Sequence, residues 1–220
     1  MNQKTISPDA LICMDDYADR YGYRVDLAYA RADNLLFGEA IYRKDAKLWL
    51  CEDLAQIIFA AAKALRKVHL RLILFDGLRT IEAQEKMLTT RRVREKPHWL
   101  QEPRLLSPPG SGGHPRAMAI DVALEDLNGN LLDMGTPFDY LAEDPSPKKN
   151  PAHRAYQGHA PHICESRKIL DDALFGAAKT LNLPLIGLHE EWWDYRFKSE
   201  YYNNFSAISE ILLHPDQKLL

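Results

Sequence analysis

Apolar residues recur along the chain with two different periods, and these periods predict where helices and strands lie. Residues 45–68 carry an apolar residue at nearly every third or fourth position, which predicts an amphipathic helix. Residues 69–75 alternate at first and then become continuously apolar, a pattern typical of a strand. Further apolar stripes predict a helix over 81–94, capped by Thr80, and another over 166–181.

The rest of the chain predicts short strands joined by long loops. Short apolar runs predict further strands over residues 117–124, 131–134, 184–188 and 192–197. The pair Asn128-Gly129 is a hairpin turn signal between the first two of these strands. Irregular structure is predicted for residues 1–45, 97–113 and 136–164. This order of elements predicts an α+β fold, with one domain over 1–220 and a mostly antiparallel central sheet flanked by helices.

The composition excludes several classes of partner. Hydrophobic residues make up 46% of the chain, charged residues 27%, and the net charge is −3, so nothing favours binding to nucleic acid or to an anionic membrane. No apolar run approaches the ~20 residues of a membrane-spanning helix, and the run near the N-terminus is too short for a signal peptide. Three widely spaced cysteines predict reduced thiols. We therefore expect a cytoplasmic protein.

Two segments carry the candidate chemistry. His114 and Asp121 lie close together at the start of a predicted strand, and Glu191 and Asp194 flank a pair of tryptophans. Imidazole nitrogen and carboxylate oxygen are zinc ligands, and catalytic zinc sites keep three protein ligands. The segments therefore predict a metal held by His114, Asp121 and Asp194, with Glu191 as the proton carrier.

On spacing alone an alternative stays open. His114 could end a loop, and the acids could be ordinary surface charges. One continuous last strand would also turn Glu191 and Asp194 to opposite faces, unless a bulge or turn separates them.

The sequence resembles the D-alanyl-D-alanine dipeptidases, the zinc enzymes of vancomycin-resistance clusters and their bacterial relatives. The family pattern S-x-H-x-x-G-x-A-x-D meets the chain at His114, Ala119 and Asp121. The remaining landmarks follow the family order, namely Tyr29 with 33–38, Asp76-Gly77-Leu78-Arg79, Met134-Gly135-Thr136-Pro137-Phe138-Asp139 and Glu191-Trp192-Trp193-Asp194.

The resemblance implies a role for each matched residue. It implies one zinc ion held by His114 and Asp121, with Glu191 as general base and acid. It also implies that Arg79 stabilises the oxyanion of the tetrahedral intermediate, as a permanently charged fork of donors can. Asp139 would receive the free ammonium group of a small dipeptide substrate.

Three positions differ from the family pattern. The family's third metal ligand is a histidine, and this chain has Asp194 there. The family serine two places before His114 is Gly112 here, so the neighbouring Ser111 would have to take its role in substrate binding, and the family glycine is Ala117. A second aspartate makes the metal less positive, so the metal acidifies its bound water less, and it makes the ligand set harder, which shifts preference from zinc toward manganese or iron. We therefore predict a weaker zinc site with a higher pH optimum, and we expect Asp194→His to raise its zinc affinity.

The sequence alone leaves alternatives both for the third metal ligand and for the activity. His189 is a rival third ligand, and a further rival is the cluster of His153, His159 and His162. The leading hypothesis is hydrolysis of D-alanyl-D-alanine by metal-activated water. The alternatives are a peptidoglycan D,D- or L,D-carboxypeptidase and a non-catalytic metal-binding member. The sequence leaves open whether the protein is a homo-oligomer.

Overall fold

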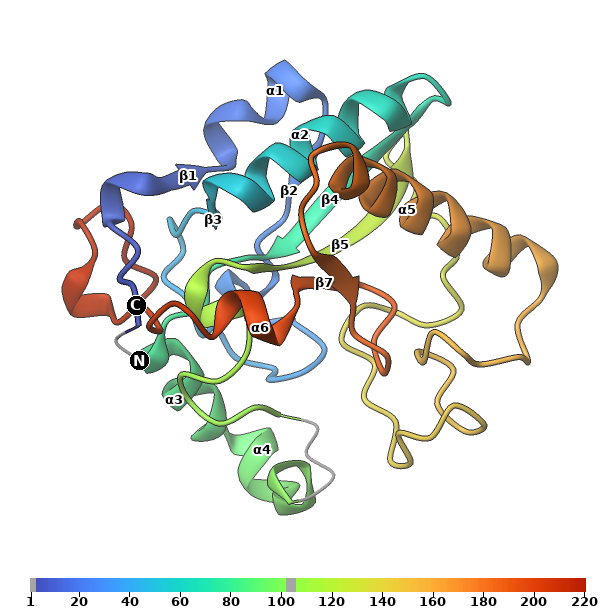
Figure 1. Ribbon diagram of the computed structural model, residues 1–220. Coiled ribbons are helices and arrows are strands. Elements are labelled where there is room, and N and C mark those ends of the chain that lie inside the picture. Colours follow the sequence, from blue (N-terminus) through green and yellow to red (C-terminus); the bar gives the residue numbers. More distant parts are fainter. Residues whose placement is uncertain (1–2, 102–105) are drawn as a thin grey trace.

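Helices and loops surround a central mixed sheet (Figure 1). The computed structural model describes residues 3–101 and 106–220. The strands are β1 (Leu11–Cys13), β2 (Arg24–Val25), β3 (Trp49–Cys51), β4 (Leu70–Asp76), β5 (Ala119–Asp126), β6 (Leu185–Gly187) and β7 (Asp194–Phe197). The α-helices are α1 (Ala18–Tyr21), α2 (Glu52–Arg66), α3 (Ile81–Leu88), α4 (Arg91–Glu95), α5 (Pro161–Thr180) and α6 (Ser199–Tyr202).

The main sheet has five strands in the order β2-β4-β5-β7-β6. The pairing of β2 with β4 is parallel, and the pairings β4–β5, β5–β7 and β7–β6 are antiparallel. Strands β1 and β3 form a separate antiparallel pair. The predicted α+β fold with a mostly antiparallel sheet is therefore confirmed.

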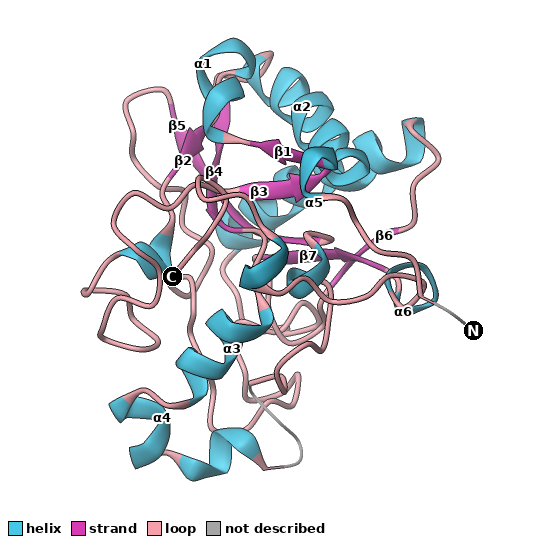
Figure 2. Ribbon diagram, turned by 90° about the vertical axis from the view of Figure 1, so that its left-hand side faces the viewer, coloured by secondary structure: helices cyan, strands magenta, loops and turns pink. Residues whose placement is uncertain are grey.

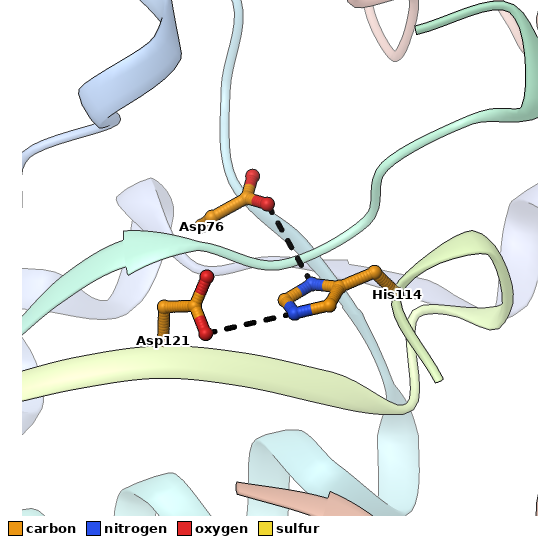
Figure 3. A group of neighbouring side chains, drawn as sticks. All are labelled: Asp76, His114 and Asp121. Carbon is orange, nitrogen blue, oxygen red and sulfur yellow. Dashed lines mark ion pairs between the residues drawn. The ribbon is translucent and has the colours of Figure 1, made fainter. Parts of the chain in front are cut away.

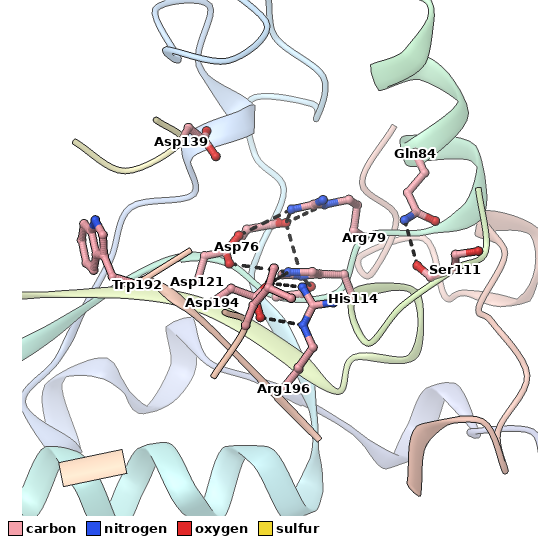
Figure 4. A network of polar contacts seen from close by, with 12 residues as sticks. Asp76, Arg79, Gln84, Ser111, His114, Asp121, Asp139, Trp192, Asp194 and Arg196 are labelled. Carbon is pink, nitrogen blue, oxygen red and sulfur yellow. Dashed lines mark hydrogen bonds and ion pairs between the residues drawn. The ribbon is translucent and has the colours of Figure 1, made fainter. Parts of the chain in front are cut away.

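Helices α2 and α5 pack against each other and cover one face of this sheet (Figures 1 and 2). The apolar stripe of α2 explains its place, because Leu54, Ile57, Ile58 and Ala61 are all fully buried. The opposite face of the sheet meets loops instead of a helical layer, and this face carries the chemistry described below (Figure 4). Within the described ranges, no helix is both long enough and apolar enough to cross a bilayer.

The predicted helix over 45–68 is wrong at its N-terminal end. Leu48 and Leu50 continue the apolar stripe, but they are two residues apart, as in a strand, and residues 49–51 form β3. The helix begins at Glu52, where two acidic residues in the first turn suit the positive end of the helix dipole.

The predicted helix over 81–94 is two helices. The Thr80 hydroxyl accepts a hydrogen bond from the Ala83 N–H at 3.2 Å, as expected for the cap. The helix then breaks at Thr89 and Thr90, whose hydroxyls donate to the carbonyls of the preceding turn. Such side-chain bonds compete with the helical pattern, and Thr90 is extended.

Two further boundaries also differ from the prediction. Residues 131–134 form no return strand, only an isolated bridge between Leu131 and Glu125. The chain turns after this bridge, where the Asp133 carboxylate accepts a hydrogen bond from the Gly135 N–H. The helix predicted over 166–181 begins earlier, at Pro161, since proline suits the first helical position.

Candidate functional site

Three aspartates stand in a row across the middle of the sheet. Asp76 at the end of β4 lies opposite Asp121 on β5, and Asp121 lies opposite Asp194 at the start of β7. Residues directly opposite each other share a face of the sheet, so the three carboxylates are neighbours, and each is at most 2% exposed. Like charges placed this way repel, so the row requires positive charge close by.

The imidazole of His114 lies beside this row of carboxylates and adds a nitrogen ligand atom to it; Figure 3 shows it with Asp76 and Asp121. Its Nδ1 lies 2.8 Å from the Gly77 carbonyl oxygen, which can only accept, so Nδ1 carries the proton. Nε2 then faces two carboxylates, at 3.3 Å from Asp194 Oδ2 and 3.6 Å from Asp121 Oδ1. Burial and Arg79 act to lower the pKa of His114, but these two carboxylates raise it to about 10.

The donor set fits a divalent cation. Asp121 Oδ1 is buried and has no hydrogen-bond partner among the described residues, although it points at an imidazole nitrogen. A buried unpaired oxygen costs free energy, and a cation at this position would satisfy it. Imidazole and carboxylate together form a ligand set for zinc, with manganese or iron accommodated as well.

Asp76 is a competing ligand that the sequence did not single out. Ligand atoms of Asp76, His114 and Asp121 lie within 4.8 Å of one another. However, Asp76 lies on the Nδ1 side of the imidazole, at 3.6 Å from a nitrogen already bonded to a carbonyl. Its oxygens also accept from Tyr42 at 2.8 Å and from Arg79.

Two arginines neutralise the ends of the row (Figure 4). Arg79 donates to Asp76 Oδ2 through Nε at 2.8 Å and lies 3.5 Å from Asp121 Oδ2. Arg196 donates to both oxygens of Asp194, through Nε at 2.7 Å and through Nη2. Burial alone would raise the pKa of Asp194, but Arg196 and His114 hold it far below its usual range.

Glu191 stands on the wall of the same cavity as these groups. Residues 192 and 193 form a turn before β7 begins, which removes the conflict of faces between Glu191 and Asp194. Burial, followed by the carboxylates of Asp194 and Asp121, raises the pKa of Glu191 to about 8. A carboxyl group with this pKa can both accept and return a proton near neutral pH.

Asp139 closes another part of the cavity, whose volume is about 380 Å³. One of its oxygens accepts from the Tyr29 hydroxyl at 2.9 Å, and the other, Oδ2, is buried without a partner among the described residues. Burial and then Asp121 raise the pKa of Asp139 well above its ordinary value. A cationic group entering the cavity would find an unpaired acceptor here.

The remaining candidates lie in different places. Ser111 is exposed at the rim, and its carbonyl accepts from the side chain of Gln84. His189 is exposed, and it is not among the residues that line the cavity. The three histidines at 153, 159 and 162 do not form a cluster. They bond separately, to the Ala155 N–H, the Pro151 carbonyl and Asp133.

Comparison with known proteins identifies the family of this chain. The family model described as D-ala-D-ala dipeptidase, of the M15 peptidases, matches residues 16–210. The chain belongs to this peptidase family. It is also 27% identical over 171 residues to the D-alanyl-D-alanine dipeptidase of Escherichia coli (strain K12), across 78% of this chain and 77% of that protein.

The backbone conformation bears on two departures from the dipeptidase pattern: it disfavours the alanine at 117 and favours the glycine at 112. Ala117 occupies the glycine position with φ of 53°, in the left-handed region where a Cβ is strained. Gly112 replaces the serine and has φ of 89°, a conformation that only glycine adopts easily. The loop before His114 therefore takes a path in which a serine at position 112 would be strained.

Sequence reasoning missed the partner of Asp194. Arg196 lies two residues further along β7, so it shares a face with Asp194. That spacing was visible in the sequence, but it became informative only once the segment was known to be a strand in register with Asp121.

Proposed function

We propose that this chain is a metal-dependent dipeptidase that hydrolyses D-alanyl-D-alanine, with zinc as its metal. Family membership and the Escherichia coli relative support the peptidase activity and its dipeptide class. The observation that carries the metal is the convergence of two carboxylate oxygens on one imidazole nitrogen, one of them buried and unpaired.

In this proposal His114, Asp121 and Asp194 hold the ion. We prefer Asp194 to Asp76 as the third ligand because Asp194 lies on the free Nε2 side of the imidazole. When bound, a zinc ion would polarise the scissile carbonyl and acidify a water molecule. Manganese and iron are the alternatives for a set with two carboxylates.

The residues around the ion then divide the work of hydrolysis. Glu191 takes a proton from the attacking water as the water oxygen bonds to the carbonyl carbon. The same carboxyl returns that proton to the amide nitrogen as the C–N bond breaks, so the products are an amine and a carboxylic acid. Arg79 donates to the carbonyl oxygen while it carries negative charge.

Asp139 and Tyr29 give this cavity its preference for a short substrate. The unpaired oxygen of Asp139 would accept hydrogen bonds from the ammonium group of the dipeptide, and Tyr29 fixes the orientation of that carboxyl. A peptide extended at its N-terminus has an amide in place of the ammonium group, so it would leave this buried acceptor poorly satisfied.

Metal analysis combined with a D-alanyl-D-alanine hydrolysis assay tests the proposal. The wild type should contain one metal ion per chain and release D-alanine. Glu191→Gln should keep its metal and lose about 10²–10⁴-fold in kcat. Glu85→Gln, an exposed glutamate on α3, is the matched control and should behave as the wild type.

Three results would contradict the proposal. These are a wild type that binds no metal, a Glu191→Gln enzyme with full turnover, or a wild type that binds metal but cleaves no dipeptide. Cleavage of longer peptidoglycan stem peptides in place of the dipeptide would favour a carboxypeptidase.

A further inference from the structure

The replacement of a histidine ligand by Asp194 changes the charge of the proposed metal site. A divalent cation with two imidazoles and one carboxylate has a formal charge of +1. With one imidazole and two carboxylates that charge would be zero, and a less positive metal polarises its ligands less. The chain therefore needs a compensating charge if the site is to retain its acidity.

Arg196 provides a positive charge at the altered position. It bonds both oxygens of Asp194 in the side-by-side geometry that guanidinium and carboxylate prefer. Its side chain is only 16% exposed, so solvent screens this charge weakly. The oxygen that accepts from Nη2 is the same Oδ2 that lies 3.3 Å from His114 Nε2.

The guanidinium also extends toward the second altered position. A Cβ at Gly112 would stand 3.7 Å from Arg196 Nη1, so the side-chain space at position 112 borders the guanidinium. Asp194, Arg196 and Gly112 thus adjoin one another, and two of the three positions depart from the family pattern.

We propose that Arg196 is a positioning residue that makes Asp194 act as an electrically neutral ligand in place of histidine. This rests on the proposed function, because it requires a bound cation. With the guanidinium included, one dication, two carboxylates and one arginine give the site a formal charge of +1 again. Arg196 also fixes the carboxylate so that Oδ2 faces Nε2.

The proposal predicts an order of metal affinities that follows the formal charge. Arg196→Gln lowers the charge to zero and should bind zinc at least about tenfold more tightly than the wild type. Asp194→His raises the charge to +2 and should bind at least about tenfold more weakly. The double variant Asp194→His/Arg196→Gln returns to +1 and should lie within about tenfold of the wild type.

The experiment measures zinc dissociation constants by competition with a chromophoric chelator, together with kcat on D-alanyl-D-alanine. Arg196→Gln should lose at least about tenfold in kcat although it binds metal more tightly, a split that a merely structural role would not produce. Arg196→Lys keeps the charge and should retain the wild-type affinity within about threefold. Arg71→Gln breaks an arginine–carboxylate pair with Glu125 outside the site and is the matched control.

Each outcome decides between the proposals. A wild type that binds no zinc overturns both the metal-dependent function and the role of Arg196. A wild type that binds zinc, combined with an Arg196→Gln variant of equal or weaker affinity, overturns the role of Arg196 alone. If Arg196→Gln does not fold, the comparison of Asp194→His with the double variant decides, and equal affinities in these two refute the role.

Discussion

Replacement of Arg79 by methionine should separate the structural role of this arginine from its catalytic role. Arg79 Nη2 lies 2.7 Å from Asp76 Oδ2, and the Asp76 carboxylate is completely buried. At an effective dielectric constant of ~20 the attraction of such a pair is about 6 kcal/mol, partly offset by desolvation. Removal of one partner leaves a buried, uncompensated carboxylate, so Arg79→Met should lower the free energy of unfolding by about 3–5 kcal/mol.

A second substitution should remove this structural effect but not the catalytic one. Asp76→Asn deletes the buried charge and retains an oxygen that can accept from Tyr42, as Asp76 Oδ1 does at 2.8 Å. Arg79→Met/Asp76→Asn should therefore regain all but about 1–2 kcal/mol of the lost stability. Its kcat/KM should stay about 10²–10³-fold below that of the wild type, because the donor to the developing oxyanion is still missing.

The test combines urea unfolding with steady-state hydrolysis of D-alanyl-D-alanine and metal analysis. If activity returns together with stability in the double variant, Arg79 serves only to neutralise Asp76, and our catalytic assignment is refuted. Asp76→Asn alone also tests the ligand set, since loss of the metal in this variant would make Asp76 a ligand in preference to Asp194.

Other predictions follow from the same geometry. Ala117→Gly should raise the free energy of unfolding by about 0.5–1 kcal/mol because it relieves the left-handed backbone at φ 53°, which urea unfolding would detect. Tyr29→Phe removes the donor to Asp139 and should raise KM about tenfold with little change in kcat; an unchanged KM would contradict the ammonium site. A thiol reagent at pH 8 should modify only the exposed Cys164 in the native protein and all three cysteines after unfolding. The thiolate is the reactive form of cysteine, and burial raises the pKa of Cys51 to about 12.

The long amphipathic elements could be predicted from the sequence, and the short ones could not. The stripe of α2 and the apolar run of β4 carry their own periodicity over many residues, so local pattern was sufficient. Strand β1 has three residues and β2 has two, and each exists because a distant segment pairs with it. Long-range pairing of this kind leaves no periodic signal, which is why residues 1–45 were predicted to be irregular.

Within the site, the identities of the reacting groups were more predictable than their environment. Short motifs led to His114 and Glu191, and both lie at the cavity. The three-aspartate row and the Asp194–Arg196 pair depend on the register of β4, β5 and β7, which no local motif specifies. Sequence reasoning therefore treated Asp194 as a bare carboxylate, whereas the structure shows it bonded to a guanidinium through both oxygens.

The register of these strands changes the effect on zinc binding that we expect from a substitution at position 194. A row of three buried carboxylates is tolerable only because each has a cationic neighbour, and Arg196 is the neighbour of Asp194. A histidine placed there alone would leave that arginine buried without its anion and next to the proposed ion. The expectation from sequence, that Asp194→His by itself would strengthen zinc binding, therefore reverses once the strand is in place. If the family histidine can be restored here, it requires a change at Arg196 as well, since the two positions form one electrostatic unit.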